Sequence, residues 1–308
     1  MPTWTGKNVA VLYGGPSTER EVSLRTGKAC ADALVAKGYD VALVDVDREL
    51  PARLRERKID VVFNALHGRW GEDGCVQGLL EAMGIPYTGS GVLASALGME
   101  KTVSKAMFRS LGLSVIDYRV FPASRAGSIK ASDLPFGIPC VVKPSGEGSS
   151  VGVHLVKDPT KLGAACTDAA TFKGDVIVER YVKGTEVNVA VLEGKALGAI
   201  EIEPANEFYD YAAKYTAGTT KYHYPARIPE AHVKRVMEAA EIAHRGLGCA
   251  GVTRVDFIVA GDGTPYILEI NTLPGMTATS LVPKIAAGLG IPFPDLCERI
   301  LESAALKA

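Results

Sequence analysis

The chain has 308 residues, of which 47% are hydrophobic and 22% charged, and its formal net charge is −1. These values are ordinary for a globular protein of two or three packed units, and they give no reason to expect nucleic acid or an anionic membrane as a partner. No apolar run approaches the length of a membrane span, and the first residues lack the apolar core of a signal segment. The six cysteines form no C-x-x-C pair, which predicts buried thiols in a reducing compartment and not a zinc or disulfide framework.

Residues 8–98 alternate between strand and helix patterns. The expected strands are 8–13, 39–46 and 59–65. A helix capped by Ser17 or Thr18 should follow the first strand and continue to about Lys37. The third strand is a nearly continuous apolar run, which suits a parallel sheet covered on both faces. Such an open α/β unit binds ligands at the carboxyl ends of its strands.

Two polar clusters fall at those carboxyl ends, at residues 14–23 and 65–74. Glu19, in the first cluster, could simply stabilise the start of its helix through the helix dipole, and composition alone favours that interpretation. His67, in the second cluster, could be satisfied by its own loop. Composition alone therefore leaves the function of these clusters open.

Residues 89–94 match the dinucleotide pattern G-x-G-x-x-A. No acidic residue follows at the distance of a ribose contact, and the preceding strand is short, so a tight turn before a helix at 92–98 is the better interpretation. The sequence contains no G-x-x-x-x-G-K-[ST], which excludes a P-loop protein.

A second unit begins near Met99 with a helix that carries Lys101 and Lys105 on one face. Further on, Lys143 ends a strand, and the glycine- and serine-rich residues 145–153 lead to the next strand. N–H and hydroxyl groups in such a loop can wrap phosphates, which is typical of a lid over a triphosphate. A plain surface hairpin would have a similar composition. The expected elements are 100–110, 115–121, 140–144, 153–156, 175–182 and 186–192.

Later in the chain, residues 208–215 form an aromatic and basic segment between strands. Taken alone, it could be an ordinary tyrosine-rich surface loop. An amphipathic helix is expected at 230–247, and closing helices at 282–287 and 293–306.

Residues 252–259 and 266–271 are strand patterns separated by Gly-Asp-Gly, which predicts an antiparallel hairpin. Side chains two apart on a strand share a face, so Leu268 and Ile270 are expected to point into the core.

The opposite face of this hairpin would hold polar residues. They are Arg254, Asp256, Glu269 and Asn271. Carboxylate and amide oxygens suit Mg²⁺ better than a transition metal. A solvated face with an ion pair is the alternative, but three oxygen-donor residues and an arginine exceed what solvation requires. The chain then breaks at residues 274–275, and Ser280 opens a helix whose N-terminus can hold an anion.

The motifs R-x-D and E-x-N-x-x-P-G-M-T resemble the metal end of an ATP-grasp ligase. The longer run E-I-N-T-L-P-G-M-T-A-T-S-L is similar to the D-alanine–D-alanine ligase family, as are both N-terminal polar clusters and the run V-K-P-S-x-E-G-S-S-V-G. The resemblance covers nearly the whole chain and implies an α/β protein, α+β in its ATP-grasp part. The implied domains are an N-terminal open parallel-sheet domain at 1–98 and two ATP-grasp lobes at 99–183 and 184–308.

The resemblance also implies site residues. ATP would be held by Lys101, Lys143, Ser150, Glu179, Tyr181, Val182, Glu186 and Lys214. Mg²⁺ or Mn²⁺ would be held by Asp256, Glu269 and Asn271. The substrates would be held by Glu19, His67, Arg254, Gly275, Ser280 and Leu281. The catalytic set would be Glu19, Ser149, Tyr215, Arg254, Gly275 and Ser280.

The implied reaction is ATP-dependent ligation of two D-alanine molecules through an acyl phosphate, for peptidoglycan precursor synthesis. The resemblance further implies a cytoplasmic homodimer whose 208–215 loop closes to exclude water. A D-alanine–D-lactate ligase is one alternative, but such enzymes differ at the tyrosine of that loop and Tyr215 is retained here. Another ATP-grasp ligase would not be expected to carry H-G-R-x-G-E-D-G, and a non-enzymatic nucleotide-binding module is the third alternative.

Overall fold

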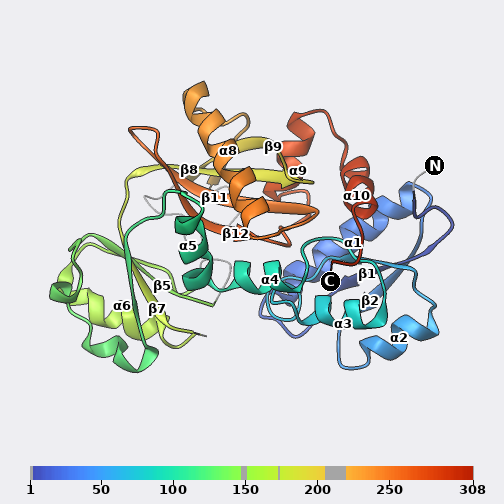
Figure 1. Cartoon of the computed structure of the whole chain (residues 1–308), viewed down its shortest axis with the longest axis horizontal. Helices are drawn as coiled ribbons and strands as arrows, with labels where there is room; N and C mark the ends of the chain where they lie inside the picture. Colours follow the sequence, from blue (N-terminus) through green and yellow to red (C-terminus); the bar gives the residue numbers. More distant parts are fainter. Residues whose placement is uncertain (1–2, 147–150, 173, 205–219, 308) are drawn as a thin grey trace.

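The computed structural model describes residues 3–146, 151–172, 174–204 and 220–307. The strands in this part of the chain form three sheets, which occupy separate regions of the molecule (Figure 1). The N-terminal sheet and its helices are blue to cyan, the four-stranded sheet is green, and the five-stranded sheet is yellow to orange.

The N-terminal sheet is parallel, with strand order β2-β1-β3. Its elements are β1 (Asn8–Tyr13), α1 (Arg20–Ala36), β2 (Asp40–Asp45), α2 (Leu50–Glu56), β3 (Val61–Asn64), α3 (Cys75–Met83) and α4 (Val92–Met99). Along β1, Val9 and Val11 are buried in a core that includes α1, whereas Ala10 and Leu12 are buried in a second core with α2 and α3. Both faces are therefore covered, which is why this strand contains no polar residue between its ends.

The four-stranded sheet is antiparallel, with order β4-β7-β5-β6. Its elements are β4 (Tyr118–Phe121), η1 (Ala123–Ser128), η2 (Ala131–Asp133), β5 (Cys140–Pro144), β6 (His154–Val156), η3 (Pro159–Lys161), α6 (Leu162–Ala169) and β7 (Val176–Arg180). Val142 and Val178 pack in one core with α6. The alternate residues Lys143 and Glu179 lie on the other face, which lines a cavity.

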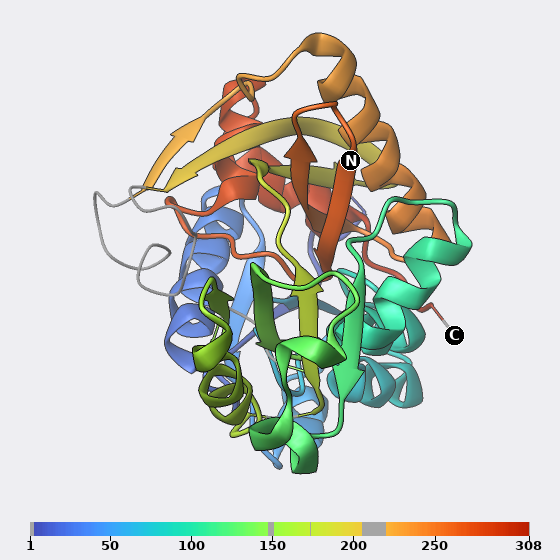
Figure 2. The ribbon, with the colours of Figure 1, turned by 90° about the vertical axis from the view of Figure 1, so that its left-hand side faces the viewer.

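The five-stranded sheet is antiparallel, with order β10-β9-β8-β11-β12. Its strands are β8 (Gly184–Leu192), β9 (Lys195–Pro204), β10 (Thr220–His223), β11 (Val252–Ala260) and β12 (Pro265–Asn271), and the helices near it are α5 (Lys101–Ser110), α8 (Glu230–Gly246), α9 (Leu281–Gly288) and α10 (Phe293–Glu302). Phe108 of α5 and Val236 of α8 pack with one face of the sheet. Ile285 of α9 packs in the core that α10 shares with α1. Figure 2 shows the green four-stranded sheet below the orange hairpin of the five-stranded sheet.

The β11–β12 hairpin has the predicted antiparallel pairing but contains a bulge. Asp256 lies opposite Glu269, while the next residue, Phe257, lies opposite Ile267, so Leu268 is an extra residue in β12. The expectation that Leu268 points into the core is wrong, because the bulge turns it to the cavity instead. Ile270, beyond the bulge, is buried as expected.

Several element boundaries differ from those expected. Ser17 Oγ accepts the N–H of Glu19 at 3.0 Å, and the N-cap of α1 is Glu19, not Ser17 or Thr18, since the helix begins at Arg20. The strand expected from residue 115 begins only at Tyr118, because Val115 forms a separate bridge to β12. The last helix ends at Glu302, after which the chain forms an antiparallel bridge to the N-terminal unit.

All six cysteines are free, as expected. Four of them are buried and Cys249 is half-buried, but the prediction of a buried thiol is wrong for Cys75, which is exposed. Within the described ranges, no helix combines the length and apolar character that crossing a membrane requires.

Candidate active site

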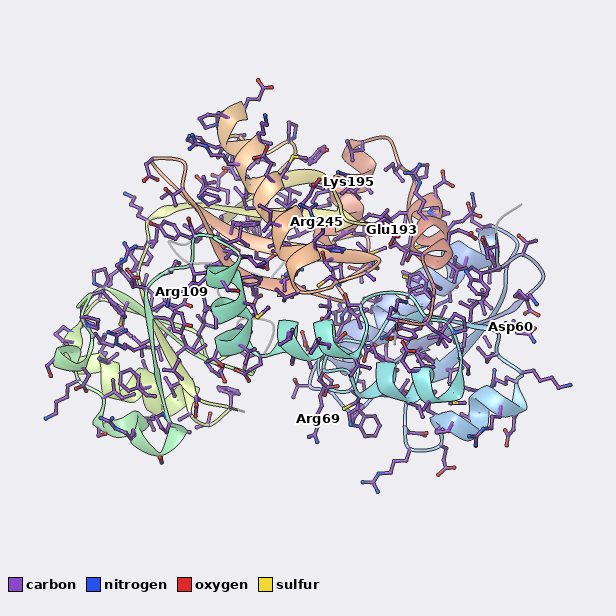
Figure 3. The ribbon with its side chains drawn as sticks, viewed as in Figure 1. Asp60, Arg69, Arg109, Glu193, Lys195 and Arg245 are labelled. Atoms are coloured by element: carbon purple, nitrogen blue, oxygen red, sulfur yellow. The ribbon has the colours of Figure 1, made fainter. Side chains whose placement is uncertain are left out.

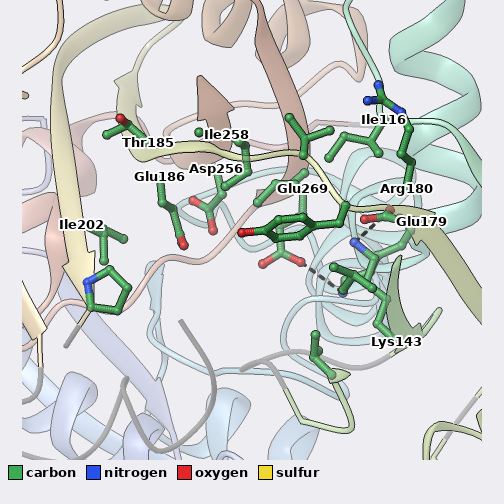
Figure 4. A pocket seen from close by; sticks show the side chains of 18 of the residues that line it. Ile116, Lys143, Glu179, Arg180, Thr185, Glu186, Ile202, Asp256, Ile258 and Glu269 are labelled. Atoms are coloured by element: carbon green, nitrogen blue, oxygen red, sulfur yellow. Dashed lines mark ion pairs between the residues drawn. The ribbon is translucent and has the colours of Figure 1, made fainter. Parts of the chain in front are cut away.

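A cavity of about 390 Å³ lies between the four-stranded and five-stranded sheets. This volume is in the range of small-molecule sites. In Figure 4, Lys143 and Glu179 project from one wall, and Glu186 and Asp256 from the other. The expected site residues that line it are Lys101, Lys143, Glu179, Tyr181, Val182, Glu186, Asp256 and Glu269.

The polar face of the β11–β12 hairpin is held together by hydrogen bonds. Arg254 donates from Nε and Nη2 to the two carboxylate oxygens of Asp256, at 2.7 and 2.8 Å. Asn271 Nδ2 donates to the same carboxylate at 3.2 Å. Because Arg254 lies opposite Asn271 and Asp256 opposite Glu269, these four residues share one face, as the spacing predicted.

Lys101, at the start of α5, supplies a positive charge to this face. Its Nζ lies 3.1 Å from Oε2 of Glu269. Burial disfavours the ammonium, but the charge and hydrogen bond of Glu269, together with the charges of Glu100 and Glu72, outweigh that effect, so the pKa of Lys101 is raised. The lysine therefore stays charged at the cavity wall.

The hairpin offers an oxygen-rich but incomplete set of metal ligands. No group of three or more histidine, cysteine, aspartate or glutamate side chains in the described ranges could hold a metal ion by itself. Asp256, Glu269 and Asn271 have the hard oxygen donors that Mg²⁺ prefers, and Mg²⁺ commonly takes one or two carboxylates and completes its shell with phosphate and water. The residues therefore fit a magnesium ion that arrives with a nucleotide.

A buried ionic cluster lies beside the cavity. Oε1 of Glu179 is 3.0 Å from Nζ of Lys143 and 2.7 Å from Nζ of Lys105. Although burial would raise the pKa of Glu179, the two ammonium groups lower it, so the carboxylate stays ionised. Lys105 was noted in the sequence as a helix-face lysine but was not predicted as a site residue.

A second charged cluster, which sequence reasoning missed, borders the cavity at β9 and β10. Nη2 of Arg227 donates to Glu201 at 2.7 Å and to Glu203 at 2.6 Å, and Nε2 of His223 lies 2.7 Å from Glu203. Both glutamates line the cavity. The positive charge of Arg227 offsets part of their negative charge, which limits their repulsion of an anionic ligand.

Glu19 and the loop after β3 meet at Gly68. The φ of Gly68 is +66°, and a Cβ at this position would lie 2.4 Å from Ser17 Oγ and 2.9 Å from Glu19 Oε2. Nε2 of the neighbouring His67 lies 3.0 Å from Thr26 Oγ1. Burial lowers the pKa of His67, so the ring is neutral near pH 7. Both candidates are therefore fixed at the carboxyl ends of the parallel strands.

Glu72 belongs to the same loop but was not predicted as a site residue. Its Oε2 accepts the N–H of Gly68 at 2.6 Å. Burial and the negative charge of Glu19 raise the pKa of Glu72 to about 8, while Arg254 acts in the opposite direction. The loop after β3 therefore lies close enough to the hairpin for the charge of Arg254 to affect the pKa of Glu72. Arg69, in contrast, extends away from the molecule (Figure 3).

The segment after β12 folds back on itself before α9. Ser280 Oγ accepts the N–H of Thr277 at 3.0 Å and lies 2.9 Å from its hydroxyl oxygen. A Cβ at Gly275 would lie 2.9 Å from Ser280 Oγ, so these two residues are adjacent. Ser280 is the N-cap of α9 and Leu281 is its first residue, which places the helix N-terminus beside Gly275.

The four remaining candidates, Ser149, Ser150, Lys214 and Tyr215, lie outside the described residues.

Comparisons with known proteins match this chain over its whole length. The family described as D-ala D-ala ligase C-terminus matches residues 107–302, and the family described as D-ala D-ala ligase N-terminus matches residues 49–90. A D-alanine–D-alanine ligase of Anaeromyxobacter sp. (strain Fw109-5) is 80% identical over 308 residues, which is 100% of both chains.

Solved structures agree with the sequence comparison. The D-alanine–D-alanine ligase of Bacillus anthracis matches with a TM-score of 0.86 and 36% identity, and its complex with ATP matches with 0.85 and 33%, each over 97% of both chains. The VanG D-Ala:D-Ser ligase of Enterococcus faecalis matches with a TM-score of 0.82 and 31% identity, over 96% of this chain and 98% of that one. The chain therefore belongs to the D-alanine–D-alanine ligase family and has its ATP-grasp fold.

Proposed function

We propose that the chain catalyses ATP + 2 D-alanine → D-alanyl-D-alanine + ADP + phosphate. The observation that carries this proposal is the continuity of two sites along the β11–β12 hairpin. Asp256 and Glu269 line the cavity that would hold ATP. The charge of Arg254, which is bonded to Asp256, opposes the rise in the pKa of Glu72, in the loop after β3 that meets Glu19. A nucleotide and an amino acid could therefore meet at this face.

In the nucleotide site, Lys101 and Lys143 would bind the α- and β-phosphates, and Lys214 the γ-phosphate. Glu179 would accept a hydrogen bond from the exocyclic amine of adenine, and Glu186 would accept hydrogen bonds from the ribose hydroxyls. The N–H of Tyr181 already donates to the carbonyl of Pro139 at 3.1 Å. The adenine edge would therefore use the carbonyl of Tyr181 and the N–H of Val182.

Asp256, Glu269 and Asn271 would bind Mg²⁺ or Mn²⁺. Such an ion, when bound, would neutralise charge on the phosphates. Arg254 and Lys101, which now pair with Asp256 and Glu269, would be drawn to the anionic substrates instead.

The first D-alanine would bind with its ammonium at Glu19, in the loop region near His67. Its carboxylate oxygen would attack the γ-phosphorus, and the bond from phosphorus to the ADP oxygen would break, which gives an acyl phosphate. Ser149 and Tyr215 would complete a hydrogen-bonded set with Glu19, and Ser150 would bind the phosphates. Holding the reactants in line is the main contribution that the protein makes to such a step.

In the second step, the amine of another D-alanine would attack the acyl carbon. The carbon–oxygen bond to phosphate then breaks, and the attacking amine loses its proton. Arg254 and the N–H of Gly275 would stabilise the oxyanion of the tetrahedral intermediate. Ser280 and the N-terminus at Leu281 would hold the carboxylate of the second D-alanine.

Phosphate release in the presence and absence of D-alanine tests this proposal. We expect release that depends on D-alanine and equals dipeptide formed. A nucleotide-binding module would show no such dependence, which would refute the proposal. D-lactate and D-serine offered as second substrates separate the related ligase activities, and D-alanyl-D-alanine should be the preferred product.

We also propose that the enzyme acts as a homodimer in the cytoplasm, where it would supply peptidoglycan precursors. Its free cysteines suit a reducing compartment. Light scattering on the purified chain would measure the oligomeric state, and a monomer at working concentration would contradict that part of the proposal.

Substitution of Gly68 by alanine should weaken binding of the first D-alanine. The added Cβ would lie 2.4 Å from Ser17 Oγ and 2.9 Å from Glu19 Oε2, so both side chains would have to move. Gly38→Ala is the matched control, since its φ is +89° but nothing lies within 4 Å of an added Cβ. Both variants should lose about 1 kcal/mol of stability through left-handed backbone strain. Only Gly68→Ala should raise the KM for D-alanine, by roughly tenfold, and equal KM values for the two variants would exclude Glu19 from the substrate site.

A phosphinate analogue of the dipeptide should inhibit more strongly after incubation with ATP. Its tetrahedral centre mimics the intermediate, and phosphorylation in the site would complete the resemblance. Inhibition constants measured with and without ATP test this. If ATP makes no difference, or if L-alanine is ligated as well as D-alanine, the substrate site is misassigned.

A further inference from the structure

Lys105 is buried in an unusual setting for a lysine. Its residue exposure is 0%, and that of its partner Glu179 is 2%. The two groups lie 2.7 Å apart, and the ring of Tyr118 lies 5.8 Å from the ammonium. Lysine is almost never fully buried unless its charge is paired, so this pair carries a structural cost that calls for an explanation.

Lys105 does not contact the space where the nucleotide would bind. It is absent from the lining of the cavity, whereas Lys143 and Glu179 are both part of that lining. Its ion-pair partner in that lining is Glu179, so an effect on a ligand would pass through this carboxylate. This makes it a positioning residue and not a catalytic one.

The cluster contains one carboxylate and two ammonium groups, and both ammonium groups pair with the same carboxylate oxygen of Glu179. Under the proposed function, the phosphates of ATP attract Lys143. If Lys143 were the only partner of Glu179, binding of ATP would leave a buried carboxylate without a counter-ion, which is costly. The second lysine removes this conflict.

We propose that Lys105 is the permanent counter-ion of Glu179, which keeps this carboxylate ionised and in place as the acceptor for the adenine amine while Lys143 binds the phosphates. This inference rests on the proposed ATP site and adds a determinant of its adenine specificity. Burial lowers the pKa of Lys105 to about 8 and the two lysines lower that of Glu179, so both members of the pair remain charged near pH 7.

The test compares ATP with purine riboside triphosphate, which lacks the exocyclic amine. The folded variant Lys105→Met keeps most of the side-chain volume and removes the charge. We expect its Kd for ATP, measured by calorimetry on the full chain, to rise roughly ten- to a hundredfold. Its preference for ATP over the purine analogue should fall, because Glu179 would no longer be held in place as an anion that accepts a hydrogen bond from the amine.

A double-mutant cycle shows whether Lys105 acts through Glu179. Glu179→Gln removes the charge that Lys105 would balance, so Lys105→Met should change the Kd for ATP by less than about threefold in that background. If the fold-changes in Kd of the two single variants simply multiply in the double variant, the proposal is overturned. An unchanged preference for ATP in Lys105→Met would also overturn it. If Lys105→Met does not fold, Lys105→Gln provides the neutral variant for the same cycle.

Two further measurements separate the possible failures. Lys28→Met, at an exposed lysine that pairs with Asp32 on α1, should leave both Kd values unchanged. D-alanine-dependent phosphate release by the unmodified chain tests the proposed function independently. An active enzyme whose nucleotide preference does not depend on Lys105 would refute this inference alone.

Discussion

Replacement of Glu269 by glutamine is expected to reduce the ligation rate by about two to three orders of magnitude while the fold is retained. Glutamine has the shape of glutamate but lacks its charge. Glu269 faces the cavity from β12 and pairs with Lys101 at 3.1 Å, opposite Asp256. Loss of the carboxylate would therefore weaken the proposed metal site and leave Lys101 without its anionic neighbour.

The measurement combines steady-state rates with calorimetry of Mg²⁺ binding in the presence of ADP. The variant should bind Mg²⁺ more weakly and have the circular dichroism spectrum of the unmodified chain. Glu238→Gln is the matched control, since Glu238 is exposed on α8 and lies 3.9 Å from Lys234. Near-normal ligation by Glu269→Gln would remove Glu269 from the metal site.

The hairpin shows how far a sequence pattern could predict this fold. Alternation placed Arg254 and Asp256 on one face of β11, and the structure has both there. In β12 the residues Ile267, Leu268 and Ile270 are all apolar, so the sequence does not reveal which of them is extra. The bulge follows from pairing with β11, and only the structure shows that Leu268 faces the cavity.

The candidate site could be predicted where a motif carries several candidate residues together. Lys143 precedes a glycine-rich loop, and Glu269 and Asn271 belong to a distinctive run, so short patterns identify them as candidates. Lys105 and Glu72 have no such local pattern. They are identified only by contacts between distant parts of the chain. Lys105 pairs with Glu179 of β7, and the charge of Arg254 affects the pKa of Glu72. Periodicity places a lysine on a helix face but does not state which carboxylate it will meet.

Arg254 should have the second largest effect, through the tetrahedral intermediate. Arg254→Lys keeps the positive charge but loses the planar fork that now donates to both oxygens of Asp256, at 2.7 and 2.8 Å. Under the proposed mechanism this fork also stabilises the oxyanion, and removal of one such donor typically costs about 10²- to 10³-fold in rate. We expect kcat to fall by that factor, while the KM for D-alanine changes by less than about threefold.

Affinity for the phosphinate analogue distinguishes this role from a structural one. If Arg254 acts on the intermediate, affinity for the phosphorylated analogue should fall in parallel with kcat/KM across Arg254→Lys and Arg254→Met, because both quantities report the same tetrahedral geometry. Arg245→Lys is the control: Arg245 lies on α8 (Figure 3), pairs with Glu241 at 3.2 Å and is exposed, so neither quantity should change. A fall in kcat with unchanged analogue affinity would mean that Arg254 only orients Asp256, and the oxyanion would then depend on the N–H of Gly275 and on other donors.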